Sequence, residues 1–125
     1  MQDTRPRFLN LTQISFPVTA IVSICQRISG VVLLLGIPVI LYYLQQSLAD
    51  IQQFHVIQSA LLNNYFVKVA VLLYVVALMF HVVGGIRHLI MDAGYLESKS
   101  VAVVTSWLSF VLTVLAMVPV IYWVI

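Results

Sequence analysis

Two histidines set seven residues apart in an apolar stretch have the greatest potential for chemistry in this chain. His81 and His88 lie in the segment HVVGGIRHLIMD (residues 81–92), with Gly84 and Gly85 between them. In an α-helix turning about 100° per residue, a spacing of seven returns to within about 20° of the starting direction. Both imidazoles are therefore expected on one face. Ionisable groups inside a membrane helix are energetically costly and usually functional.

The spacing of the two imidazoles suits the two ends of a haem. The helical rise from His81 to His88 is about 10.5 Å, comparable with the reach from a haem iron to its propionates. His81 could ligate iron near mid-membrane while His88, closer to the helix end, meets a propionate. Gly84 and Gly85 expose the backbone between them to a wide planar group or to another helix.

Helix packing is the alternative interpretation of this segment. Small residues commonly let membrane helices approach one another, and an intramembrane histidine often hydrogen-bonds a neighbour. Packing is favoured for the glycine pair alone, whereas ligation is favoured for His81. Because His81 and His88 leave one helix on the same side, they cannot be opposite ligands of one iron. A second axial ligand must come from another chain or from His55, which lies in a poorly placed loop.

The composition determines the class of protein that holds these residues. The chain has 125 residues, of which 62% are hydrophobic and 8% charged, and its mean hydropathy is +1.08, which indicates an integral membrane protein. Three apolar stretches exceed the ~20 residues needed to cross the hydrocarbon core. The sequence thus predicts an all-α membrane protein with three transmembrane helices in one domain, residues 1–125, whose N-terminal segment stays uncleaved. The spans are residues 17–44, 65–91 and 101–125.

The charged and sulfur-containing residues exclude several functions. A formal net charge of +2 is too small to indicate nucleic-acid binding. The single cysteine, Cys25, excludes an internal disulfide, a cysteine-rich metal site and covalently attached haem. No Asp or Glu lies within a predicted span, which disfavours a coupled transporter.

Positive charges predict the orientation of the helices. Most lie near the start of the first span or around the connection between the second and third spans, whereas the opposite side has only Lys68. The N-terminus is therefore expected to be cytoplasmic, with the loop 45–64 and the C-terminus on the outer, periplasmic side. Aromatic residues gather near that outer boundary, as an interfacial belt would. The cations are Arg5, Arg7, Arg27, Arg87 and Lys99, and the aromatic residues are Tyr42, Tyr43, Tyr65, Tyr122 and Trp123.

A second polar group lies early in the first span. Ser23 and Arg27 are one helical turn apart, and the predicted orientation places them level with His88 and Asp92. Hydroxyl and guanidinium donors under an apolar ceiling suit the carbonyl oxygens of a quinone, whose charge on reduction they would stabilise. Each of two residues also has an alternative role. Arg27 could instead be a topology anchor whose charged group snorkels to the membrane surface, and Asp92 could form a salt bridge with Arg27 or Arg87.

Three segments of the chain resemble a known family. RPRFLNL near the start, SICQRISGV at 23–31 and HVVGGIRHLIMDAGYLE at 81–97 look like the larger cytochrome b membrane-anchor subunit of succinate dehydrogenase (succinate:quinone oxidoreductase, complex II). The resemblance covers essentially the whole chain. The H-x-x-x-G-I-R-H-x-x-x-D pattern is its most specific part.

The resemblance implies a role for each candidate residue. In that family, the histidine matching His81 is an axial haem b ligand, and the one matching His88 lies close to a propionate. The serine and arginine matching Ser23 and Arg27 line the ubiquinone site, and Asp92 matches a residue close to that site.

One position departs from the family pattern. Many members have a histidine immediately before the arginine, where this chain has Gln26, and in some of them that histidine approaches a haem propionate. Glutamine can donate a hydrogen bond but cannot carry a positive charge. The haem environment is therefore expected to differ here.

The resemblance also implies an assembly. A second small membrane-anchor subunit would supply the other haem ligand and share the helical bundle. Together the two anchors would hold an iron–sulfur subunit and a flavoprotein subunit to the cytoplasmic face of a bacterial inner membrane, so that electrons from succinate reach ubiquinone. This chain would have no dehydrogenase site of its own and would act only within the complex. The anchor of a quinol:fumarate reductase and a haem-free structural anchor are the alternatives.

Overall fold

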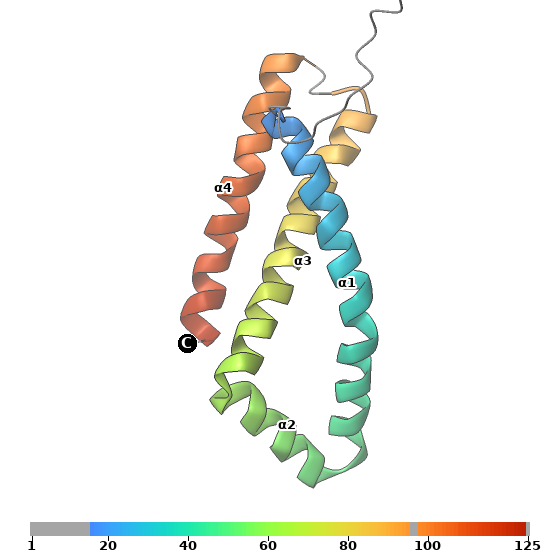
Figure 1. The fold of residues 1–125 in the computed structure, drawn as a ribbon, viewed down its shortest axis with the longest axis vertical. Coiled ribbons are helices and arrows are strands. Elements are labelled where there is room, and N and C mark those ends of the chain that lie inside the picture. The colour runs from blue at the N-terminus through green and yellow to red at the C-terminus, as the bar shows by residue number, and fades with distance from the viewer. Residues whose placement is uncertain (1–15, 96–97, 125) are drawn as a thin grey trace, which may run out of the picture.

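The chain forms long helices joined by short connections. A computed structural model describes residues 16–95 and 98–124, and all regular secondary structure within them is helical. Three helices are long and apolar enough to cross a membrane, which confirms the predicted all-α membrane fold. Arg5, Arg7 and Glu97, which contributed to the sequence-based predictions, lie outside the described residues. The helices are α1 (Val18–Ala49), α2 (Ile51–Asn63), α3 (Tyr65–Asp92) and α4 (Lys99–Val124) (Figure 1).

The connection between the first two spans is a helix, so the loop predicted for residues 45–64 is wrong. Helix α2 follows α1 after the single residue Asp50. The Asp50 carboxylate accepts a hydrogen bond from Gln52 N at 3.3 Å, and the Asn64 side-chain oxygen accepts one from Phe66 N at 2.9 Å. Polar residues that suggested a loop therefore act as N-caps of α2 and α3.

Helix α3 is the centre of the bundle. It contacts α1 and α4 more extensively than those two contact each other. In Figure 1, the start of α1, the end of α3 and the start of α4 share one end of the bundle, while α2 crosses the other end. The residues that set the antiparallel register of α1 and α3 face one another in three pairs: Gln26 with Gly84, Gly30 with His81, and Gly36 with Tyr74.

Small hydroxyl residues form the buried face of α4. They repeat at spacings of three and four residues, which keeps them on one side of the helix. Each hydroxyl donates to the carbonyl oxygen four residues earlier, at 2.7–2.9 Å, so these polar groups are satisfied without help from another helix. The residues are Ser106, Ser109 and Thr113.

Most of the apolar surface stays exposed in the isolated chain. Among the described residues, the buried hydrophobic side chains are only Val22, Phe80 and Met117. The remaining apolar surface is available to lipid or to other membrane subunits. The aromatic residues predicted to form the interfacial belt are exposed and lie toward the α2 end of the spans, but the opposite end also carries exposed aromatic residues. The predicted set is Tyr42, Tyr43, Tyr65, Tyr122 and Trp123, and the opposite end has Phe16, Tyr95 and Trp107.

A tyrosine ring packs directly against the backbone of α1. Tyr74 of α3 lies over Gly36, where a Cβ atom would overlap the ring. The Tyr74 hydroxyl donates to the Leu33 carbonyl oxygen at 3.2 Å, which fixes the ring at this position. Gly36 is therefore required for the distance between the two helices.

The substitution Gly36→Ala is expected to lower the free energy of unfolding by about 1–3 kcal/mol, because the added methyl group overpacks the contact with Tyr74. SDS titration of the detergent-solubilised chain, followed by tryptophan fluorescence, measures this loss. In a Tyr74→Ala background the same substitution is expected to cost less, because the ring is gone. An equal cost in both backgrounds would contradict the contact.

Candidate functional site

The imidazole of His81 is held between α3 and α1. Its Nδ1 atom lies 3.0 Å from the Ser29 hydroxyl oxygen and 3.2 Å from the Gln26 carbonyl oxygen. Gly30 makes room for the ring, since a Cβ atom there would lie 3.1 Å from His81 Cε1. The face of α1 that meets α3 is thus shaped around this side chain.

The side chain of Gln26 occupies the glycine pair of α3. Its Nε2 donates to the His81 carbonyl oxygen at 2.9 Å. A Cβ atom at Gly84 would overlap the Gln26 amide, and one at Gly85 would lie 3.3 Å from Nε2. The two glycines were expected to admit either a wide planar group or another helix. The structure places helix α1 against both glycines.

The other ring nitrogen of His81, Nε2, has no hydrogen-bond partner within the described residues. The hydrogen bonds of the ring in this part of the chain are all at Nδ1. Gln26 Oε1 is the one enclosed side-chain N or O atom in the described residues without a partner. His81 is half-buried, so its Nε2 keeps an unused bonding capacity beside the contact with α1.

The donor set of this chain fits one ligand of a metal centre and not a complete site. A neutral imidazole nitrogen without a hydrogen bond, oriented through the other nitrogen, is the usual arrangement of a metal-ligating histidine. Within the described residues, no group of three or more His, Cys, Asp or Glu side chains could hold a metal ion. Haem does not need such a group, because its iron takes one or two protein ligands, and His81 would supply one of them.

Arg87 packs toward α4. Its Nε donates to Thr105 Oγ1 and its Nη2 to the Ala102 carbonyl oxygen, each at 3.1 Å, and the side chain is 6% exposed. Arg87 was one of the two salt-bridge partners considered for Asp92. Its guanidinium instead joins α3 to α4. The Asp92 side chain is exposed.

The two quinone-site candidates on α1 differ in exposure. Ser23 is half-buried and Arg27 is exposed. Gln26 of α1 faces Gly84 of α3, and the two helices run antiparallel. One helical turn further toward the same end of the bundle, Ser23 is therefore level with His88, which is half-buried. No hydrogen bond within residues 16–95 and 98–124 joins Ser23, Arg27, His88 and Asp92, so the structure brings them to one end of the bundle without linking them.

Ser23 differs from the other serines of α1. The Ser29 and Ser47 hydroxyls donate to carbonyl oxygens of their own helix, at 2.8 and 2.7 Å. Ser23, in a helix described over its whole length, makes no such bond. Within the described residues its hydroxyl therefore has no hydrogen-bond partner, and it can donate to another group.

Ser29 is the contact that sequence reasoning missed. It is buried, like Val22 seven residues earlier, and the two mark the face of α1 that meets the other helices. A spacing of seven places both on one side of a helix, which is a signal that the sequence contains. Gln26 was noted only as a departure from the family pattern, although its side chain binds the backbone of His81.

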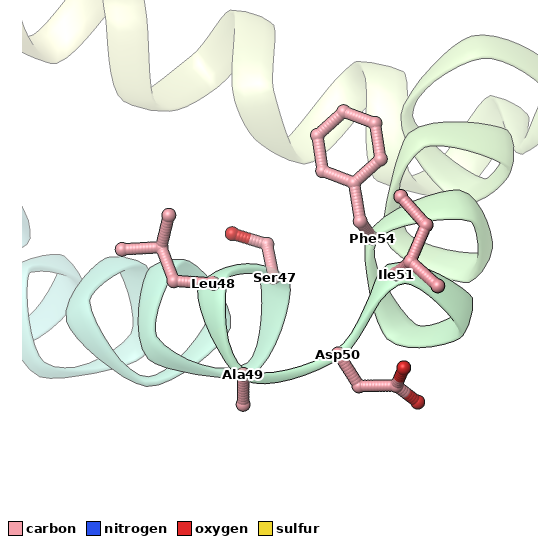
Figure 2. A pocket seen from close by; sticks show the side chains of 6 residues that line it. All are labelled: Ser47, Leu48, Ala49, Asp50, Ile51 and Phe54. Carbon is pink, nitrogen blue, oxygen red and sulfur yellow. The ribbon is translucent and has the colours of Figure 1, made fainter.

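Two hollows lie away from His81. One, of about 360 Å³, is open and sits at the corner between α1 and α2, lined by Ser47, Leu48, Ala49, Asp50, Ile51 and Phe54. Figure 2 shows Phe54 over this hollow and the Asp50 carboxylate pointing away from it. The other, of about 220 Å³, is a groove between α3 and α4 that includes Arg87. His81, the candidate iron ligand, lines neither hollow.

Comparisons with known proteins identify the family. Residues 1–121 match the family model described as succinate dehydrogenase/fumarate reductase transmembrane subunit. The succinate dehydrogenase cytochrome b556 subunit of Coxiella burnetii is 40% identical over 118 residues, which cover 94% of each protein. These findings confirm the resemblance seen in the sequence. The chain, a multi-pass membrane protein, belongs to the family of succinate dehydrogenase and fumarate reductase transmembrane subunits.

Proposed function

We propose that this chain is a membrane-anchor subunit of a succinate:ubiquinone oxidoreductase, in which it binds haem b together with a second anchor subunit and forms part of the ubiquinone-reduction site. Family membership and the cytochrome b556 subunit of Coxiella burnetii support the proposal. The observation that carries it is His81, with Nδ1 bonded to α1 and Nε2 without a partner among the described residues.

The residues around His81 divide the work of holding the cofactor. His81 would provide one iron ligand through Nε2, and His88, two turns along α3, would meet a propionate. Gly84 and Gly85 would act indirectly, because they admit the Gln26 amide that binds the His81 backbone. A bound haem b would supply a one-electron carrier in the membrane. The Gln26 amide nitrogen is engaged with His81, so His88 is the better candidate of the two for a propionate.

The free donors of α1 would serve the quinone. Ser23 would donate a hydrogen bond to a quinone carbonyl oxygen, and the Arg27 guanidinium would stabilise the negative charge that develops on reduction. Asp92, exposed at the same end of the bundle, would help to deliver protons. Because Arg27 and Asp92 are exposed, other subunits would complete the pocket.

The proposed assembly places that end of the bundle at the cytoplasmic face of a bacterial inner membrane, with the C-terminus periplasmic. The partners are a second small anchor subunit, which supplies the other haem ligand, an iron–sulfur subunit and a flavoprotein subunit. The residues of this chain that support the orientation are Arg27, Arg87 and Lys99 at that end against Lys68 at the other. The family description also includes fumarate reductase, so the anchor of a quinol:fumarate reductase is the second candidate.

His81→Ala is expected to abolish most of the b-type signal in a reduced-minus-oxidised spectrum of the complex co-expressed with its partner subunits, because it removes one iron ligand. His55→Ala, which alters an exposed histidine of α2, is the matched control and should retain the signal. Absence of a b-type signal in the parent complex, or an unchanged signal in His81→Ala, would overturn the haem assignment.

Ser23→Ala and Arg27→Ala are each expected to slow quinone reduction by about 100- to 1,000-fold, because each removes a donor at the developing charge. Succinate-dependent reduction of a soluble dye should be unchanged, since it bypasses the membrane site. Ser47→Ala, which removes a hydroxyl near the other end of α1, should leave both activities intact. Equal loss of quinone and dye reduction would count against a quinone-binding role.

A further inference from the structure

The hydrogen bonds around His81 Nδ1 determine where the imidazole proton lies. Ser29 has one hydroxyl hydrogen, and Ser29 Oγ lies 2.8 Å from the Gln26 carbonyl oxygen and 3.0 Å from Nδ1. That carbonyl oxygen also lies 3.2 Å from Nδ1, and it can only accept. Nδ1 therefore has two oxygen neighbours and, at 3.3 Å, the Gln26 amide nitrogen.

The two neutral tautomers satisfy this arrangement unequally. With a proton on Nδ1, the ring donates to the Ser29 oxygen and to the Gln26 carbonyl oxygen, while the Ser29 hydroxyl donates to the same carbonyl. With Nδ1 unprotonated, the ring can accept from the Gln26 amide nitrogen at 3.3 Å, but its lone pair then faces the Gln26 carbonyl oxygen at 3.2 Å. It also faces the Ser29 oxygen at 3.0 Å, unless the Ser29 hydroxyl gives up its bond to that carbonyl. The Nδ1–H form uses both oxygen acceptors and leaves only the longest contact, the one to the amide nitrogen, without a hydrogen bond.

We propose that Ser29 is a positioning residue which, with the Gln26 backbone carbonyl, holds His81 as the Nδ1–H tautomer and so makes Nε2 the nitrogen available to a metal. The part of this inference that concerns iron depends on the proposed function. The tautomer itself is a property of this chain alone.

The surroundings of the pair strengthen this control. Ser29 is 5% exposed, so water does not compete effectively for its hydroxyl. The bond from Gln26 Nε2 to the His81 carbonyl oxygen holds the His81 backbone from α1, the helix that also carries Ser29, and the ring packs against the backbone of Gly30. A hydrogen bond donated from the second imidazole nitrogen fixes the ring orientation and raises the basicity of the ligating nitrogen.

The tautomer is tested on the full chain, labelled with ¹⁵N-histidine and solubilised in detergent, without haem. At a pH well above the ordinary pKa of a free imidazole, the ¹⁵N shifts distinguish a protonated from an unprotonated ring nitrogen. The wild-type spectrum of His81, assigned by its loss in His81→Ala, is expected to show Nδ1–H. Ser29→Ala is expected to increase the Nε2–H population. Ser106→Ala, which removes a buried hydroxyl bonded within α4, should leave the His81 signals unchanged.

The second measurement uses the complex with its partner subunits. Ser29→Ala is expected to weaken haem retention by about 10- to 100-fold in a haem-transfer titration, as for other residues that orient a metal ligand, whereas Ser106→Ala should not. A predominant Nε2–H tautomer in the wild type, or identical His81 signals in Ser29→Ala, would overturn the proposal for Ser29. A wild-type complex without haem b would instead overturn the proposed function and leave the tautomer result standing.

Discussion

The close approach of α1 to α3 is the constraint on which the rest of the structure depends. Along this contact, a side chain of one helix repeatedly occupies the space that a glycine leaves on the other. An added Cβ atom at Gly84 would overlap the Gln26 amide, and one at Gly36 would overlap the Tyr74 ring. Separating the helices would also break the bonds that hold the His81 backbone and ring. The same contacts therefore pack the two helices and orient His81, the candidate ligand. At Gly84, helix packing and a role in the site are compatible interpretations.

Hydrogen bonding distinguishes the polar groups that hold the helices together from those that are candidates for an external partner. In hydrocarbon each polar group needs a partner, because water is not available to replace one. The buried hydroxyls of α4 donate within their own helix, and Arg87 donates to α4. His81 Nε2, the Ser23 hydroxyl and the enclosed Gln26 Oε1, by contrast, have no partner within the described part of the chain. The first two of these are groups for which the proposed function requires a ligand or another subunit.

The sequence predicted the three spans because an apolar run long enough to cross the hydrocarbon core is rare in a water-soluble fold. It failed at α2, where Asp50 and Asn64 resemble loop residues but cap helices, since capping depends on local geometry that hydropathy does not contain. The importance of His81 followed from its residue type and its depth in the span. Its contact with Ser29 did not, because that contact depends on the register between two helices far apart in the chain. A single sequence indicates which face of each helix is distinctive but not which residues of two faces meet.

The arrangement around His81 is suited to the shared centre proposed for this chain. His81 is positioned by α1 and α3 of the same chain, so its ring is already oriented before any partner binds. Preorganisation of this kind reduces the ordering that association must supply. Arg27 and most apolar side chains of the described residues nevertheless lie at the surface, so this chain alone would not enclose the proposed cofactor. The fold therefore favours a division of labour in which this subunit fixes the direction of one ligand and its partners close the site around it.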